Sequence, residues 1–116
     1  MPYGPQYLFV WDKTPLGVKI QCKSTSFSNA LRSVTDDYES RLVTLFENAN
    51  FTQLGTGPIW MFYVPSVQDL LKSGYYLMSA VDRSTAIKKI LDRLVKSFFN
   101  AMLKLPFKKS KVKHYI

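Results

Sequence analysis

The chain has little of the chemistry on which most enzymes depend. Its 116 residues include one histidine and one cysteine. His114 lies in a lysine-rich segment, away from any residue that it would activate, so a histidine base serving Cys22 or a serine is not expected. One histidine and one cysteine also cannot supply the ligands of a four-coordinate metal site. These scarcities predict a non-catalytic protein without a metal or cofactor.

Other absences narrow the class further. The segment 55–58 (Gly-Thr-Gly-Pro) lacks the lysine of a phosphate-binding loop and leads into a predicted strand instead of a helix. Asp36, Asp37 and Glu39 lie on a predicted helix, where neighbouring residues are about 100° apart, so their carboxylates do not converge on a cation. A solvated acidic helix face explains them better.

Long apolar runs are absent as well. No uninterrupted stretch approaches the ~20 residues that cross a bilayer, and the first residues lack the basic and then apolar order of an export signal. The sequence therefore predicts an intracellular protein, either cytoplasmic or nuclear.

Acidic residues are almost absent from the C-terminal part, and this gives the sequence its most informative feature. Residues 1–82 contain six basic and seven acidic side chains, whereas residues 83–116 contain ten basic side chains and the single acid Asp92. Such asymmetry is typical of contact with nucleic acid, an anionic membrane or an acidic protein. A solvated helix face followed by a solubilising tail has the same composition. The ten basic residues are Arg83, Lys88, Lys89, Arg93, Lys96, Lys104, Lys108, Lys109, Lys111 and Lys113.

Hydrophobic periodicity predicts the secondary structure. Alternating or continuous apolar runs predict strands at 6–12, 18–23, 59–64 and 75–81. Spacings of three and four predict a long helix from about 24–28 to 46, a short helix from Ser66 to Gly74 with Asp69 near its start, and a long helix from Asp82 or Ser84 to Leu105. The expected class is α+β, with the order ββαβαβα: a mostly antiparallel sheet of about four strands packed with two long helices and one short helix. Residues 1–105 would form a single domain and residues 106–116 a basic C-terminal tail.

Aromatic residues on the strands are expected in the core. Phe9, Trp11, Trp60 and Phe62 are interpreted in this way because buried aromatics outnumber exposed stacking platforms in small domains. The run 59–64 has no polar face, which is typical of a central strand.

Two apolar residues of the last helix break its pattern. Phe99 and Leu103 lie one turn apart, beyond the edge of the apolar arc and near charged residues. They predict a partner surface such as a homodimer contact, with a widened buried face as the alternative. In the tail, Phe107, Tyr115 and Ile116 are expected to contact a neighbouring chain or a lipid interface.

Three functions are compatible with these features. The first is a non-catalytic basic binding protein that contacts DNA or RNA phosphates through the ten basic residues, with little sequence selectivity. The second is a self-associating structural protein, similar in character to viral matrix proteins, that binds an anionic membrane and oligomerises through Phe99, Leu103 and the tail. The third is an interaction subunit for an acidic protein. Nucleic acid is the expected main partner, and a homo-oligomer is the expected state.

Overall fold

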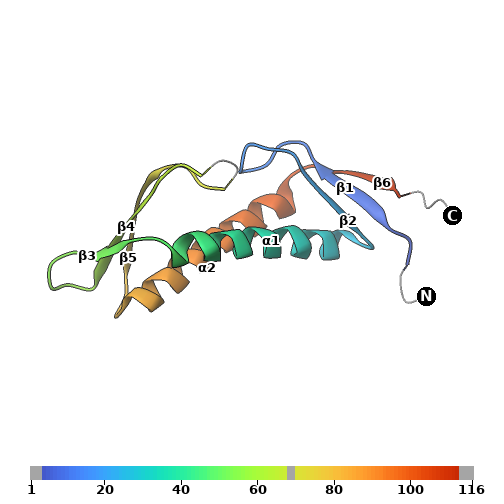
Figure 1. Cartoon of the computed structure of the whole chain (residues 1–116). Coiled ribbons are helices and arrows are strands. Elements are labelled where there is room, and N and C mark those ends of the chain that lie inside the picture. The colour runs from blue at the N-terminus through green and yellow to red at the C-terminus, as the bar shows by residue number, and fades with distance from the viewer. Residues whose placement is uncertain (1–3, 68–69, 113–116) are drawn as a thin grey trace. The chain divides into compact units, whose positions relative to one another are not determined.

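The computed structural model describes residues 4–67 and 70–112 of the chain (Figure 1). This part is α+β, with two sheets of three antiparallel strands and two helices. In chain order the elements are β1 (Tyr7–Trp11), β2 (Ile20–Ser24), α1 (Phe27–Glu47), β3 (Phe51–Gln53), β4 (Ile59–Val64), β5 (Gly74–Ser79), α2 (Arg83–Lys104) and β6 (Lys108–Lys111).

The chain divides into two compact units. Unit 1 comprises residues 1–37 and 98–116, and unit 2 comprises residues 38–97. Both helices continue from one unit into the other, so unit 1 contains the start of α1 and the end of α2, and unit 2 contains the end of α1 and the start of α2.

The sheet of unit 1 has the strand order β2-β1-β6. β1 and β2, which correspond to the predicted strands 6–12 and 18–23, form an antiparallel hairpin with Phe9 opposite Cys22. Its turn contains Gly17 at a φ of 78°, in the left-handed region that glycine adopts without steric cost. On the other side of β1 lies β6, so strands from the two ends of the described chain are neighbours (Figure 1).

Aromatic rings form the core of unit 1. Phe9 and Trp11 are fully buried, as predicted. Both pack against Phe27 at the start of α1 and against Phe107, which precedes β6. The rings of Phe27 and Phe107 are stacked, with centroids 4.6 Å apart. Because Phe107 joins this cluster, the chain is held against β1 before β6 begins.

The sheet of unit 2 has the order β3-β4-β5, so β4 is central, as predicted. Its inward residue Phe62 is buried against Phe46 of α1, at 4.6 Å between centroids, and stacks on Phe51 of β3 at 4.4 Å. The guanidinium of Arg83 lies over the Phe51 ring, 5.4 Å from its centroid. The run 59–64 has no polar face, but Ile59 and Tyr63 on its other face are exposed.

Side-chain caps fix the starts of both long helices. The Ser26 hydroxyl accepts a hydrogen bond from the Asn29 N–H at 3.1 Å, and the Asp82 carboxylate accepts one from the Thr85 N–H at 2.7 Å. Each bond satisfies a backbone donor that has no partner within the helix. The sequence predicted both helices and located these starts to within a few residues.

The predicted single sheet of four strands was wrong. Residues 48–57, for which neither a strand nor a helix was predicted, contain β3, and the predicted tail contains β6. The predicted short helix after Ser66 is also wrong for the residues described there, because Val67 and Leu71 form an isolated antiparallel bridge with hydrogen bonds of 3.0 and 3.1 Å. Asp69 lies outside the described residues. Neither helix of the described ranges has a stretch long and apolar enough to cross a membrane.

Candidate functional site

The structure divides the predicted basic set between the two units. All nine of its described members are exposed. Unit 2 contains Arg83, Lys88, Lys89, Arg93 and Lys96, and unit 1 contains Lys104, Lys108, Lys109 and Lys111. Lys113 lies outside the described residues. The charge that is continuous in sequence therefore belongs to two separate structural units.

Unit 1 holds most of the positive excess. Its segments contain nine basic and three acidic residues, whereas residues 38–97 of unit 2 contain seven basic and five acidic residues. A surface that attracts polyanions needs an excess of one sign. Unit 1 meets this condition better than unit 2.

Strand β6 contains three of the lysines. Its pairing with β1 fixes which of their backbone groups face β1 and which face away from it. The Val112 N–H donates to the Gln6 carbonyl at 3.0 Å. Because hydrogen-bonded pairs alternate along antiparallel strands, the backbone groups of Lys108 and Ser110 face β1, and those of Lys109 and Lys111 face away from it. No described strand pairs with that outer side of β6. We call Lys108, Lys109 and Lys111 the basic edge.

Two lysines of the basic edge lie on one face of the sheet. Lys109 is the register partner of Phe9, and Lys111 is that of Tyr7. Residues two apart on a strand are separated by about 7 Å. The Lys109 ammonium lies 4.1 Å from the centroid of the Tyr7 ring, and this cation–π contact restrains the side chain without neutralising its charge.

An acidic residue accompanies the third lysine. Asp12 forms ion pairs with Lys108 at 3.1 Å and with Lys19 at 3.6 Å. The hydrogen bond from Lys108 is the main cause that lowers the pKa of Asp12. All three side chains are exposed to solvent, so the pairs are weak, but Asp12 cancels part of the charge of Lys108.

Tyr7 and Asp12 were not among the residues that the sequence singled out for the site. Their roles depend on the pairing of β1 with β6, which joins segments about a hundred residues apart. No local sequence pattern predicts that pairing, because β6 reads Lys-Lys-Ser-Lys and lacks the β-branched and aromatic residues of a typical strand.

Several basic residues of unit 2 make contacts within that unit. Arg83 donates a hydrogen bond to the Ala49 carbonyl at 2.9 Å, and Lys89 donates one to the Ser79 carbonyl at 2.9 Å. Lys96 forms a helical ion pair with Asp92 at 3.0 Å. The two hydrogen bonds join the first part of α2 to the neighbouring loop and strand, and the ion pair lies within α2.

The apolar residues predicted as partner contacts have different environments. Phe99 and Leu103 are 37% and 48% exposed, which agrees with their position off the apolar arc. Phe107 is 39% exposed but stacks on Phe27, so it contributes to the core of unit 1. Tyr115 and Ile116 lie outside the described residues.

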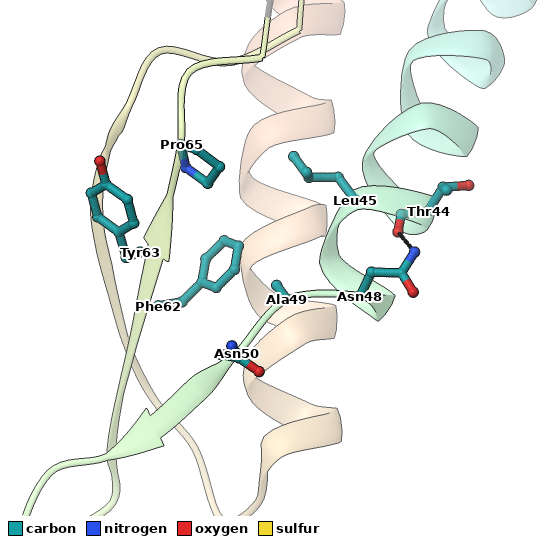
Figure 2. Close-up of a pocket in the computed structure, with 8 residues that line it drawn as sticks. All are labelled: Thr44, Leu45, Asn48, Ala49, Asn50, Phe62, Tyr63 and Pro65. Atoms are coloured by element: carbon teal, nitrogen blue, oxygen red, sulfur yellow. Dashed lines mark hydrogen bonds between the residues drawn. The ribbon is translucent and has the colours of Figure 1, made fainter.

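A hollow of about 570 Å³ lies in unit 2 between the end of α1 and β4 (Figure 2). Phe62 points toward α1, while Tyr63 lies on the other side of β4. The Asn48 amide donates to the Thr44 carbonyl at 2.9 Å, so this polar group serves the end of the helix. The hollow is lined by Thr44, Leu45, Asn48, Ala49, Asn50, Phe62, Tyr63 and Pro65. This lining contains no lysine, arginine, aspartate or glutamate, and so it does not extend the basic edge.

Two further results bear on the site. Within residues 4–67 and 70–112, no three His, Cys, Asp or Glu side chains are grouped so that they could hold a metal ion. Comparison of the chain with protein-family models, with curated proteins and with solved structures found no match. The functional conclusion therefore depends on the geometry and charge of the chain itself.

Proposed function

We propose that this chain is a non-catalytic nucleic acid-binding protein whose basic edge contacts phosphates, with Lys104 as an additional contact. One observation carries the proposal: β6 places Lys109 and Lys111 on one face of an open sheet edge in the unit with the larger positive excess. Lys104 lies in the last turn of α2, shortly before this strand.

Binding of this kind depends on counterion release. Each lysine that neutralises a phosphate frees condensed cations, so the affinity falls steeply with salt and depends little on base sequence. The Tyr7 ring keeps the Lys109 ammonium in place, which lowers the entropic cost of fixing a long side chain on a phosphate. Lys108 contributes less, since Asp12 competes for it.

A structural role explains lysines on β6 without any ligand. Lysines on an edge strand discourage pairing with the edge of another sheet. That role requires charge at the edge but no affinity for a polyanion, so a binding measurement separates it from the proposed function.

The membrane alternative would depend on the apolar residues of the tail. Insertion into lipid would use Phe107, Tyr115 and Ile116, but the Phe107 ring is packed among Phe9, Trp11 and Phe27. Each inserted side chain would add a hydrophobic contribution that salt does not screen. Binding to anionic vesicles therefore becomes a comparison arm of the experiment.

The test is the salt dependence of binding to a labelled duplex, followed by fluorescence anisotropy. With about four phosphate contacts, raising the salt from about 50 to 200 mM should weaken binding roughly a hundredfold. The variant Lys109→Gln/Lys111→Gln should bind more weakly and reduce the slope of log affinity against log salt by about 2. The matched control Lys13→Gln/Lys72→Gln makes the same change in net charge at exposed lysines outside the predicted set and should keep the slope.

Other outcomes contradict the proposal. If the wild type binds neither duplex nor single strand at low salt, the protein is not a nucleic acid-binding protein. Binding to anionic vesicles or to an acidic polypeptide instead would identify one of the alternative partners. An equal loss of slope in the control would show that total charge, and not the basic edge, determines the affinity.

A further inference from the structure

Strand β5 is an edge strand with a free backbone edge. The Ala80 N–H donates to the Pro58 carbonyl at 2.8 Å, which continues the antiparallel register of β5 with β4. By alternation, the backbone groups of Tyr76 and Met78 face β4, and those of Tyr75, Leu77 and Ser79 face away from it. Among the described residues, the outward groups of Tyr75 and Leu77 have no hydrogen-bond partner, while the Ser79 carbonyl accepts a hydrogen bond from Lys89.

The face next to this edge is apolar and exposed. Tyr75 and Leu77 are 69% and 56% exposed, and their register partners on β4 are Tyr63 and Met61. Tyr63 is 52% exposed, and its ring lies 5.1 Å from that of Tyr75. Aromatic residues and methionine without neighbouring charges are typical of the centre of protein–protein interfaces.

β5 also lacks the features that protect edge strands. Natural edges carry lysine or proline, or they are very short. β6 contains three lysines, β2 contains Lys23, and β3 has only three residues. β5 reads Gly-Tyr-Tyr-Leu-Met-Ser, with neither charge nor proline over six residues. Among the edge strands of the described part, it is the longest one without a charge.

We infer that β5 pairs with β5 of a second copy of this chain, antiparallel and about a two-fold axis at Tyr76. Tyr75 of each copy would then lie opposite Leu77 of the other copy, and the free backbone groups of both residues would pair between the chains. This register leaves the Ser79 carbonyl to Lys89. The β3-β4-β5 sheets of the two copies would join into one continuous sheet, with Tyr63 and Tyr75 of each copy on its exposed face.

The β5 edge is complementary to itself, which identifies the strand that pairs with it as β5 of a second copy. An isologous contact requires a strand that tolerates its own residues opposite it, and aromatic–aliphatic pairs across strands are favourable. The equivalent pairing of β6 with itself would place lysines against lysines, which is destabilising. The proposed interface is distinct from the basic edge, so it neither requires nor excludes binding of nucleic acid.

The test is the mass of the protein over a concentration series, by sedimentation or light scattering without nucleic acid. The wild type should shift from monomer to dimer. Leu77→Lys should remain monomeric, because it places charge at the edge, and Leu77→Pro should do so because it removes an outward N–H that β4 does not use. Leu77→Val is the matched control and should dimerise like the wild type. If Leu77→Pro loses its circular dichroism signal, Leu77→Lys alone decides.

Cross-linking tests the register. In a Cys22→Ser background, Tyr75→Cys/Leu77→Cys should form a covalent dimer on oxidation, since opposed residues in a hydrogen-bonded pair have Cα atoms about 5.5 Å apart. Tyr75→Cys alone should not. A wild type that stays monomeric at every concentration overturns the inference, and so does a folded Leu77→Lys variant that still dimerises. A dimer lost only in Phe99→Ser/Leu103→Ser would place the interface on α2 instead.

Discussion

The ammonium of Lys109 lies 4.1 Å from the centroid of the Tyr7 ring, although these residues come from the last and first strands of the described chain. The contact is diagonal, because Lys109 is the register partner of Phe9, and Tyr7 is that of Lys111. An exposed cation–π contact contributes about 0.5–1 kcal/mol. The ring therefore positions the charge and leaves it available to a second, anionic group.

This arrangement predicts that replacing Tyr7 and replacing Lys109 have different effects. Tyr7→Leu should lower the free energy of unfolding by about 0.5–1 kcal/mol and weaken binding to a duplex by no more than about threefold, with the salt slope unchanged. Lys109→Gln should reduce the slope by about 1, because a phosphate contact is lost. Tyr7→Phe keeps the ring and serves as the control. A Tyr7→Leu variant that changes the slope as much as Lys109→Gln would show that the ring does more than position the lysine.

The cap of α2 predicts a dependence of stability on pH. The Thr85 N–H bonds to the Asp82 carboxylate and lowers its pKa. Because the pKa is lower in the folded state, the stabilisation is complete above the ordinary value near 4 and is lost as the pH falls through the folded-state value. Asp82→Ala should therefore lower Tm at pH 7, and its difference from the wild type should shrink in acid. Asp82→Asn keeps a capping acceptor without titrating. A pH-independent deficit in Asp82→Ala would contradict the role of the ionised carboxylate.

The two long helices and the first hairpin were predictable because their signals are local. The apolar spacing of α1 and α2 and the capping residues Ser26 and Asp82 are all visible within a few residues of sequence. β3 and β6 were not predictable in this way. The lysines of β6 form a strand because Lys108–Lys111 pairs with β1, a contact between distant segments that overrides local propensity.

The candidate site was predictable in composition but not in arrangement. The excess of lysine and arginine after Asp82 is a property of the sequence. Its division between two units depends on the course of α2, which begins in one unit and ends in the other. The exposed face of Tyr63 and Tyr75 was missed because an uninterrupted apolar run is typical of a strand covered on both sides.

The packing of Phe107 predicts an effect on folding. Its ring stacks on Phe27 and contacts two buried aromatics, but it is also 39% exposed. Phe107→Ser should therefore lower the free energy of unfolding by about 2–3 kcal/mol, less than the cost of truncating a fully buried phenylalanine. Phe99→Ser/Leu103→Ser should change it much less. Denaturant unfolding measures both, and an equal loss in the two variants would mean that the exposed pair also belongs to the core.

Asp12 gives the sharpest prediction for binding, since it holds a lysine of the basic edge by an ion pair. Its carboxylate pairs with Lys108 at 3.1 Å and with Lys19 at 3.6 Å. Asp12→Asn keeps the size of the side chain and removes the charge, so Lys108 becomes available to a phosphate; duplex affinity should rise and the salt slope should steepen by about 1. Lys108→Gln should then reduce the slope more in the Asp12→Asn background than in the wild type. The pKa of Asp12 is lowered in the fold, so the wild type should approach the affinity of Asp12→Asn only when the pH falls through that lowered pKa, which lies below the ordinary value of an aspartate. If Lys108→Gln reduces the slope by about 1 in both backgrounds, Asp12 does not restrain Lys108, and all three lysines of the basic edge bind phosphate alike.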